Sequence, residues 1–579
     1  MKNKNTLTRS LSAFLMTINC LVVLTIIWSC YRSLDWSDES FYYLGYTFFD
    51  NPNLSGASFH MIFNNFFSIF ELSLPGVRLI RLVLTIVASA ILYIGFEKFT
   101  GNKKITDKLI FFNVVLSGML LSYTWAPLAL SYNSMSSILM GLITGCWLLS
   151  INANNIFYKV AYSFTLGGLF VFLFFVKITN ILLFPVIVIS TIYVLSRRKS
   201  LNRNTIKFTF IYTTSFVVGV LLSLQRVSLG AGKIIPTLKN YVATTLGILD
   251  DNTGHSIEAI FKKYLWNSEV LLNKLMYPLI LIFSLFLILK FNLFKFKKET
   301  VLKFSNLYKY FNVLILIVIT ELEYYWKGGQ DSEYQVLNCY IFIWFGALLS
   351  RYLDNKKVNV ILFLGLLSVP FAGSLGTNNG LSAQFLFYGA FVFVGIYLLV
   401  YSSKNMFYKY SIISLIILLC ASQVITASVF YPYRQPALTN CNNKLEGIKF
   451  LKGLKVDNST YKLRKELAFL EKNKAKYVFA YNRHRGMVLL INKIPFSLSW
   501  FDAELTPSMY SAINESKIDP RDVIFLLPKN SPLQVEVLAC LKNNGIDFKQ
   551  KYIVVKQVKY FDFELKKEVT LNVYIPRSN

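Results

Sequence analysis

The sequence has 579 residues, of which 54% are hydrophobic and only 16% are charged, and its mean hydropathy is +0.47. Soluble globular chains carry roughly 25% charged residues, so this composition excludes a single water-soluble domain and favours lipid as the solvent for most of the chain. The net charge of +29 comes without a nucleic-acid-binding pattern, and the basic residues lie mostly between apolar runs, where they set membrane topology.

We expect a polytopic α-helical membrane protein with about thirteen spans, since a bilayer requires about 20 apolar residues per helix. In chain order the expected spans cover 11–30, 80–97, 109–129, 133–151, 160–176, 178–196, 208–226, 271–290, 310–325, 336–350, 358–375, 383–402 and 411–430. The third to sixth could instead include half-helices, because connections such as 130–132 are very short. The first span has no A-x-A cleavage site, so it is expected to remain as an anchor.

Basic residues precede the first span and follow the second, sixth, eighth and tenth spans. Such segments stay in the cytoplasm, so the N-terminus is expected there. The segments 31–79, 227–270 and 324–335 and the chain after Phe430 are then expected on the opposite side of the membrane. The side assigned to the C-terminus depends on the odd number of spans.

The last part of the chain changes character after residue 430. Helical patterns at Asn458–Lys474 and Pro532–Asn543 alternate with short β-rich runs at Tyr477–Tyr481, Met487–Ile491, Val523–Pro528, Tyr552–Val558 and Thr570–Ile575. We therefore expect a membrane body over 1–430 and a small α/β domain outside the cytoplasm over 431–579. Cys441 and Cys540 fall in this domain, and the sequence leaves open whether they pair.

Three carboxylates, Asp35, Asp38 and Glu39, follow directly after the first span. Carboxylates at a membrane surface are costly unless they are solvated, paired or used. One of them could deprotonate an acceptor hydroxyl or hold a divalent cation such as Mg²⁺ or Mn²⁺. The alternative is a solvated loop in which Ser37 or Asp38 caps a helix that starts at Glu39.

The run Asp38-Glu39-Ser40-Phe41-Tyr42 resembles the Asp-Glu-x-x-Tyr signature of GT-C glycosyltransferases, which include protein O-mannosyltransferases and the aminoarabinose transferases of lipid A. Two further stretches fit the family's order, namely Pro75–Leu82, with Arg78 and Arg81, and the Gly-rich helix that ends at Lys177. The resemblance implies a polyprenyl-phosphate-linked sugar donor, inversion at the anomeric centre, a catalytic acidic residue in the first outer loop and cations on the donor phosphate. The segment Tyr431–Arg434 also resembles uncharacterised bacterial members.

Other candidate residues have simpler interpretations beside the functional one. Glu321, Glu323 and Tyr324 end the ninth span and suit either sugar binding or an interfacial aromatic belt with solvated acids. Lys177 could bind phosphate or extend to the membrane interface. The basic loop Arg483–Gly486 could bind an acidic glycan or lipid phosphate, or remain a solvated loop.

Taken together, we expect a bacterial inner-membrane glycosyltransferase of GT-C type that modifies a cell-surface glycan or lipopolysaccharide. Its partners would be the polyprenyl-phosphate sugar, a glycan or lipid acceptor and the bilayer. Asp38 would be the general base, with Glu39 and Asp35 as secondary carboxylates, Lys177, Arg78 and Arg81 on the phosphate, and Tyr42 near the sugar. The alternatives are a transporter or flippase, or a polymerase, for lipid-linked glycans. The donor sugar, the acceptor and any metal stay open.

Overall fold

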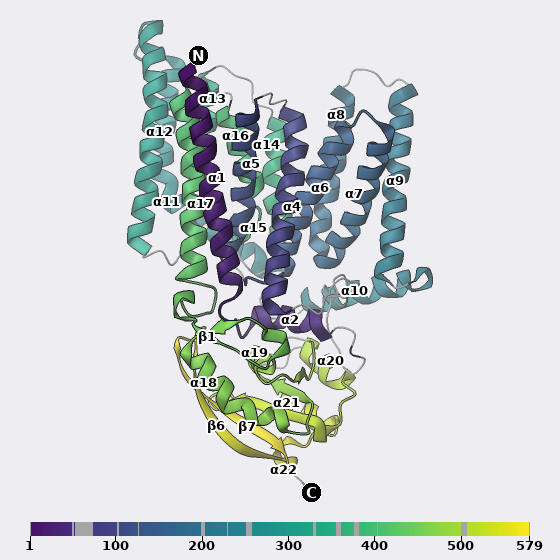
Figure 1. Cartoon of the computed structure of the whole chain (residues 1–579). Coiled ribbons are helices and arrows are strands. Elements are labelled where there is room, and N and C mark those ends of the chain that lie inside the picture. The colour runs from purple at the N-terminus through teal and green to yellow at the C-terminus, as the bar shows by residue number, and fades with distance from the viewer. Residues whose placement is uncertain are drawn as a thin grey trace.

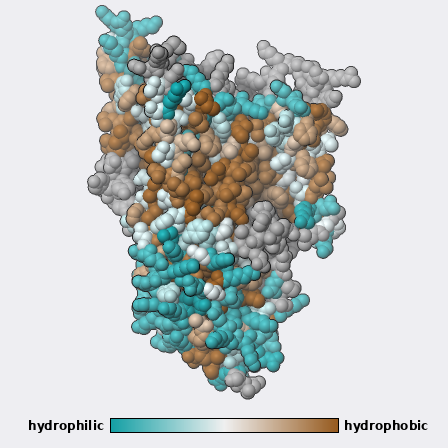
Figure 2. All heavy atoms as spheres, viewed as in Figure 1, coloured by the Kyte–Doolittle hydropathy of each residue, from teal (hydrophilic) through white to brown (hydrophobic). Residues whose placement is uncertain are grey.

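A computed structural model describes residues 2–48, 51, 73–100, 104–125, 127–197, 203–228, 230–249, 257–327, 332–354, 360–375, 381–401, 403, 405–498 and 507–577. Figure 1 shows a bundle of long helices with the N-terminus at one end and a sheet-containing domain at the other. Figure 2 shows that the bundle carries a broad hydrophobic surface, whereas the C-terminal domain is mainly hydrophilic. This separation fits a membrane body with a water-exposed domain.

The described part of the bundle consists of helices that follow one another along the chain. They are α1 (Lys2–Cys30), α2 (Asp38–Phe48), α4 (Leu74–Thr100), α5 (Ile105–Leu120), α6 (Tyr132–Asn152), α7 (Ile156–Val176), α8 (Leu183–Arg197), α9 (Arg203–Val227), α10 (Ile234–Leu249), α11 (Ile257–Phe291), α12 (Lys298–Lys327), α13 (Ser332–Leu353), α14 (Val360–Ser374), α15 (Leu381–Phe387), α16 (Gly389–Tyr401) and α17 (Met406–Val429). Three 3₁₀ turns join them, namely η1 (Leu121–Tyr123), η2 (Ile178–Leu182) and η3 (Ala231–Lys233).

Within the described residues, eight helices are long and apolar enough to cross a membrane. They cover Thr6–Cys30, Leu74–Lys98, Ile105–Tyr123, Tyr132–Asn152, Ile156–Val176, Thr209–Val227, Lys298–Ile319 and Met406–Val429. A bent pair, Phe261–Val270 and Leu275–Phe291, makes a ninth if it is one span, and three shorter apolar helices cover Ile178–Thr191, Cys339–Leu353 and Gly389–Tyr401. The membrane class is thus supported, but the expected thirteen spans are not confirmed.

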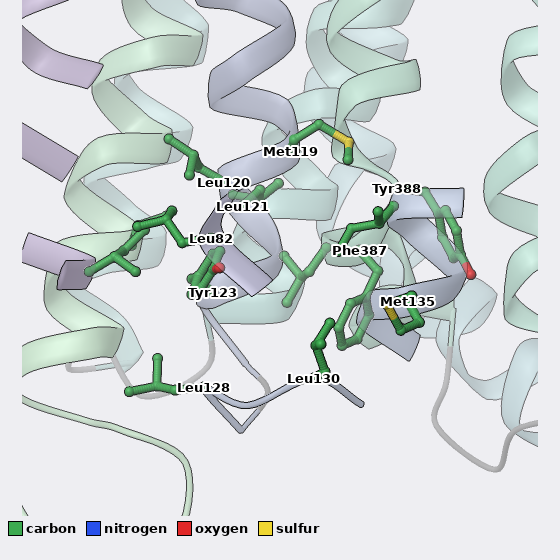
Figure 3. Packing of buried hydrophobic residues seen from close by; sticks show 14 of the residues in the cluster. Leu82, Met119, Leu120, Leu121, Tyr123, Leu128, Leu130, Met135, Phe387 and Tyr388 are labelled. Atoms are coloured by element: carbon green, nitrogen blue, oxygen red, sulfur yellow. The ribbon is translucent and has the colours of Figure 1, made fainter. Parts of the chain in front are cut away.

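Helix breaks account for several differences from the expected spans. The third expected span corresponds to α5, which ends at Leu120 and is followed by a 3₁₀ turn that ends at Tyr123, although apolar residues continue to Leu130. Figure 3 shows Leu130 on the segment that follows, close to Met135 and Phe387, and all three belong to the buried core. The apolar residues after Tyr123 therefore pack under the bundle as an irregular segment. Periodicity does not reveal such a break, because a buried turn is as apolar as a buried helix.

Glycines bring several helices into close contact. A Cβ atom on Gly167 of α7 would lie 2.2 Å from the carbonyl oxygen of Phe216, and one on Gly219 of α9 would lie 2.1 Å from that of Phe164. α4 and α6 meet in the same way at Gly95 and Gly145. Small residues allow the helix backbones to approach this closely. In lipid, where burial of apolar side chains gives little driving force, such close packing stabilises the contact between helices.

The C-terminal domain contains a two-stranded sheet, a five-stranded sheet and short helices. β1 (Asn443–Lys444) pairs antiparallel with β2 (Lys455–Val456). The larger sheet has the order β4-β3-β5-β7-β6, with β3 parallel to β4 and β5, and β7 antiparallel to β5 and β6. Its strands are β3 (Tyr477–Ala480), β4 (Ile494–Pro495), β5 (Val523–Pro528), β6 (Tyr552–Asp562) and β7 (Lys567–Pro576). The helices are α18 (Asn458–Leu467), α19 (Gly486–Leu490), α20 (Pro507–Glu515), α21 (Val535–Asn543) and α22 (Phe548–Lys551).

One expected strand is wrong and one open question is answered. The run Met487–Ile491 forms helix α19 instead of a strand, because a short, fully buried apolar run carries no period that separates the two. Cys441 and Cys540 are free thiols, and the sulfur of Cys540 lies 3.7 Å from the side-chain oxygen of Asn514.

Candidate functional site

The segment after the first span is tied to the C-terminal domain and turns into α2. The amide of Ser33 donates to the carbonyl of Lys455 at 2.7 Å, and the amide of Lys455 donates to the carbonyl of Tyr31 at 2.9 Å. Ser33 has a φ of 58°, which turns the chain back toward the bundle. The carboxylates that follow therefore lie where the bundle and the C-terminal domain meet, at the end of the bundle opposite the N-terminus (Figure 1).

Asp35 caps the start of α2. Its Oδ1 accepts hydrogen bonds from the amide and the hydroxyl of Ser37 at 3.0 and 2.8 Å, and its Oδ2 accepts from the amide of Glu39 at 3.0 Å. Burial and the nearby charge of Asp38 raise the pKa of Asp35 to about 7. The expected cap at Ser37 or Asp38 is thus supplied by a carboxylate just upstream, and Asp35, 1% exposed, is not part of a solvated loop.

Glu39 forms a buried ion pair with Arg78 of α4. The Nε and Nη2 atoms of Arg78 donate to the two carboxylate oxygens at 2.8 and 2.5 Å, and Glu39 also accepts from the amide of Ala129 at 3.0 Å. The remaining donors of Arg78 bind the carbonyls of Cys30, Arg32 and Ser33. A guanidinium has five N–H donors, so this set uses all of them. In this arrangement Arg78 has no donor left for the phosphate contact expected from the sequence.

Arg81 holds the irregular segment after η1. Its guanidinium donates to the carbonyls of Pro127 and Ser122, and it lies 4.1 Å from the ring centroid of Tyr123. Arg81 is 0% exposed and bound to these carbonyls, so its guanidinium does not face a surface that a phosphate could reach in this arrangement. One turn apart on α4, Arg78 and Arg81 fasten two separate segments to the bundle. Most partners of both arginines are backbone carbonyls from distant parts of the chain, and Arg78 also binds the Glu39 carboxylate, so these contacts indicate a structural role.

Asp38 is the carboxylate of the three that reaches water, with 26% of its side chain exposed. Its Oδ2 accepts from the hydroxyl of Tyr433 at 2.8 Å, and its Oδ1 lies 3.5 Å from Nη1 of Arg434. Burial and the charge of Asp38 raise the pKa of Tyr433, and the same two causes raise that of Tyr42. Tyr42 also packs edge-on against Tyr132, with 6.3 Å between ring centroids. Asp38 thus lies among tyrosine rings and one guanidinium.

Arg434 links Asp38 to the C-terminal domain. Its Nη2 lies 3.2 Å from the carboxylate of Glu564, which also pairs with Arg483 at 2.8 Å. The backbone of Arg434 has a φ of 52°, a left-handed conformation that persists in a non-glycine residue only when its surroundings fix it. Tyr433, Arg434 and Glu564 were not predicted as site residues. The motif Tyr431–Arg434, directly after the last span, was the sequence signal that could have found the first two.

A series of hydrogen bonds through Ser136 and Asn180 connects Lys177 with the start of α6. Tyr132, whose hydroxyl interacts electrostatically with Asp38, begins α6, and Ser136 lies one turn further along. Ser136 accepts a hydrogen bond from the amide group of Asn180 at 2.7 Å. Three residues before Asn180, the Nζ of Lys177 donates to the carbonyl of Gly373 at 2.7 Å. Lys177 is 8% exposed, so it is bound inside the protein and does not extend to a membrane interface.

The basic loop Arg483–Gly486 is an interface element and not a solvated loop. The amide of Gly486 donates to the carbonyl of Trp36 at 2.8 Å, and the guanidinium of Arg485 lies 5.1 Å from the ring centroid of Phe41. His484 is 5% exposed, and its ring nitrogens lie 3.0 Å from the carbonyl oxygen of Tyr481 and 3.2 Å from the carboxylate of Asp562. The loop therefore docks the C-terminal domain onto residues 35–41, which carry the three carboxylates and are called the acidic segment below.

The remaining candidates are the acidic and aromatic residues of α12 and a possible metal site. Glu321, Glu323 and Tyr324 belong to the last turns of α12, and their side chains lie outside the described residues. Among the described residues there is no group of three His, Cys, Asp or Glu side chains that could hold a metal ion. Asp35 and Glu39 are engaged with the backbone of α2 and with Arg78, so the three carboxylates do not fit a shared cation.

No family model matches the chain, and no curated protein matches it.

Proposed function

We propose that this chain is a membrane glycosyltransferase of GT-C type in a bacterial inner membrane. It would transfer one sugar from a polyprenyl phosphate to a hydroxyl of a glycan or lipid acceptor on the periplasmic side, where the C-terminal domain would lie. The proposal depends mainly on one observation. Of the three carboxylates after the first span, Asp38 alone is accessible to water and free of a helix cap or a buried ion pair.

The chemistry that suits Asp38 is general base catalysis. Asp38 would take the proton of the acceptor hydroxyl as the oxygen attacks the anomeric carbon. The bond from that carbon to the phosphate oxygen breaks as the new glycosidic bond forms, and the polyprenyl phosphate leaves with the electron pair. Attack opposite to the leaving group inverts the anomeric centre. A positioned base contributes about 10²–10⁴ in rate.

The surroundings of Asp38 support this role. The guanidinium of Arg434 and the hydroxyl of Tyr433 hold the Asp38 carboxylate in one direction. The buried ring of Tyr42 packs edge-on against the half-buried ring of Tyr132 near Asp38, and an aromatic ring suits the apolar side of a sugar ring. Of the three cations predicted for the leaving phosphate, Lys177, which follows α7, is the one whose ammonium group has a single contact among the described residues, to the carbonyl of Gly373. It would exchange the Gly373 carbonyl for phosphate oxygen when the donor binds.

Replacing Asp38 by Asn tests the proposal. Purified protein in lipid discs would be supplied with labelled polyprenyl-phosphate sugars and lipid or glycan acceptors, and product would be counted. We expect Asp38→Asn to lose about 10²–10⁴ in transfer rate while its melting temperature stays close to that of the parent. The matched control is Asp519→Asn, an exposed carboxylate on the C-terminal domain. Undiminished transfer by a well-folded Asp38→Asn protein would refute the assignment.

Glu39→Gln separates structure from chemistry in the same assay. It leaves the buried Arg78 guanidinium without its counter-ion, which typically costs about 3–5 kcal/mol of stability. Its transfer activity should therefore fall together with the yield of folded protein. A Glu39→Gln protein that is as stable as the parent yet inactive would indicate that Glu39, and not Asp38, acts on the substrate.

A further inference from the structure

The helical hairpin of α11 and α12 contains an apolar groove that plays no part in the proposed reaction. The groove encloses about 750 Å³, within the range of about 300–1,000 Å³ that is usual for ligand sites. Its lining is aliphatic or aromatic throughout and includes Leu285, Leu289, Phe296, Phe304 and Leu314. Leu307, another lining residue, is 59% exposed, so the groove is reached from the surface of the bundle. α12 contains one of the candidate spans, Lys298–Ile319, and a groove on the side of a membrane span would face hydrocarbon.

The turn that closes the hairpin has a fixed shape. The side chain of Asn292 accepts from the amide of Phe296 at 2.7 Å and donates to its carbonyl at 2.8 Å. Asn292 and Lys295 both have left-handed backbones, with φ of 47° and 52°. The rings of Phe294 and Phe296 lie 5.7 Å apart and belong to the groove lining. The groove therefore extends as far as this turn.

Lysines surround the same turn. Residues 290–309 contain six lysines and one acidic residue, Glu299. Two of the lysines anchor the hairpin to α13, because Lys309 pairs with Asp354 at 2.7 Å and Lys290 donates to the carbonyl of Tyr352 at 3.2 Å. The other four, Lys295, Lys297, Lys298 and Lys303, are exposed and form no ion pair with any residue that the structure describes. Exposed ammonium groups beside an apolar groove complement a lipid that carries a phosphate.

We infer that this groove is a binding site for an anionic phospholipid, whose acyl chain lies between α11 and α12 and whose phosphate contacts Lys295, Lys297 and Lys298. Phosphate oxygens accept charge-assisted hydrogen bonds from ammonium groups. A polyprenyl phosphate shares this chemistry, but the hairpin turn lies at the N-terminal end of the bundle, away from α2 and Asp38 (Figure 1). A polyprenyl phosphate bound at this turn would be too far from Asp38 to act as its sugar donor. The structure therefore favours a membrane phospholipid as the occupant of the groove.

Retention of defined lipids tests the site directly. The whole protein would be reconstituted in discs that contain equal parts of phosphatidylglycerol and phosphatidylcholine. It would then be released from the discs in a mass spectrometer, and the lipids that stay bound would be counted. We expect selective retention of phosphatidylglycerol. The triple variant Lys295→Gln/Lys297→Gln/Lys298→Gln should reduce that retention by roughly tenfold or more. A matched triple, Lys542→Gln/Lys549→Gln/Lys551→Gln, removes the same charge from the exposed surface of the C-terminal domain and should leave it unchanged.

A second pair of variants tests the groove without changing charge. Leu307→Trp should fill the groove and release the lipid, whereas Leu221→Trp, at a comparably exposed leucine of α9, should not. Equal retention of the two lipids by the parent, or unchanged retention in both the lysine triple and Leu307→Trp, would overturn the inference. So would displacement of phosphatidylglycerol by polyprenyl phosphate at equal mole fraction. These readouts are independent of glycosyl transfer, so the two proposals can fail separately.

Discussion

Asp35, Asp38 and Glu39 are close in the sequence, but the backbone gives each a different environment. Asp35 precedes α2 and binds its first amides. Asp38 and Glu39 are neighbours on the helix, so their side chains point about 100° apart, one toward water and Arg434 and the other toward Arg78. Within five residues the chain therefore contains a helix cap (Asp35), a candidate base (Asp38) and the buried counter-ion of Arg78 (Glu39).

The raised pKa of Asp35 predicts a pH-dependent stability. The folded protein holds the Asp35 proton up to about pH 7, whereas the unfolded chain releases it near the ordinary pKa of 3.8. Between these values the folded state binds more protons, so the free energy of unfolding falls as the pH rises, and it is highest below the unfolded pKa. Asp35→Asn removes this contribution.

Thermal unfolding of the parent and of Asp35→Asn between pH 4 and 8 measures the effect. The melting temperature of the parent relative to the variant should decrease steadily up to about pH 7 and then level off. A constant difference across the range would mean that Asp35 is already ionised in the folded protein.

At the residue scale the sequence located the acidic cluster but not the division of roles within it. The sequence showed that Asp38 follows the first span and that the next span carries arginines. The hydrogen-bond partners of Arg78 and Arg81 could not be predicted, because apart from Glu39 they are mostly backbone carbonyls in the segments 30–33 and 122–127. A hydrogen bond from an arginine to a distant backbone carbonyl leaves no pattern of side chains in the sequence. The contact of Asp38 with Tyr433 is likewise invisible without the fold.

Among the elements of the bundle, α7 and α9 depend most clearly on glycine. Gly167 and Gly219 each face a backbone carbonyl of the other helix at a distance that leaves no space for a Cβ atom. This packing joins the middle of α7 to α9. The Gly-rich pattern on this helix was visible in the sequence, but its partner helix was not.

Gly167→Ala should separate α7 from α9. A Cβ atom 2.2 Å from the carbonyl oxygen of Phe216 forces the backbones apart, and overpacking of this kind costs roughly 1–3 kcal/mol. The melting temperature of detergent-solubilised protein should fall. The control is Gly365→Ala in α14, because a Cβ atom there meets nothing within 4 Å and alanine favours the helix. Equal melting temperatures for the two variants would contradict the close contact.

The whole molecule is held together by a core that crosses from the bundle into the C-terminal domain. Buried side chains of α1, α4, α17, β2, α18 and one face of the larger sheet form one continuous cluster, whereas the opposite face of the sheet has a core of its own. The two parts were predicted from composition as separate units, and their order along the chain is as expected. Their shared core was not foreseen, because burial against a distant domain leaves the same apolar pattern as burial within one.

This shared interface predicts that the C-terminal domain controls the site. A Cβ atom on Gly486 would lie 2.8 Å from both the Cα of Trp36 and the hydroxyl of Ser40, so Gly486→Ala should push the loop 483–486 away from the acidic segment. The sheet does not depend on that contact and should stay folded. We therefore expect faster amide exchange at residues 33–41 with little change at β5 and β7. The rate of the proposed glycosyl transfer should also fall, because Arg434 is tied to the domain through Glu564. Gly232→Ala, where nothing lies within 4 Å, is the control and should change neither measurement. Unaltered exchange at 33–41 in Gly486→Ala would show that the domain rests on the acidic segment without restraining it.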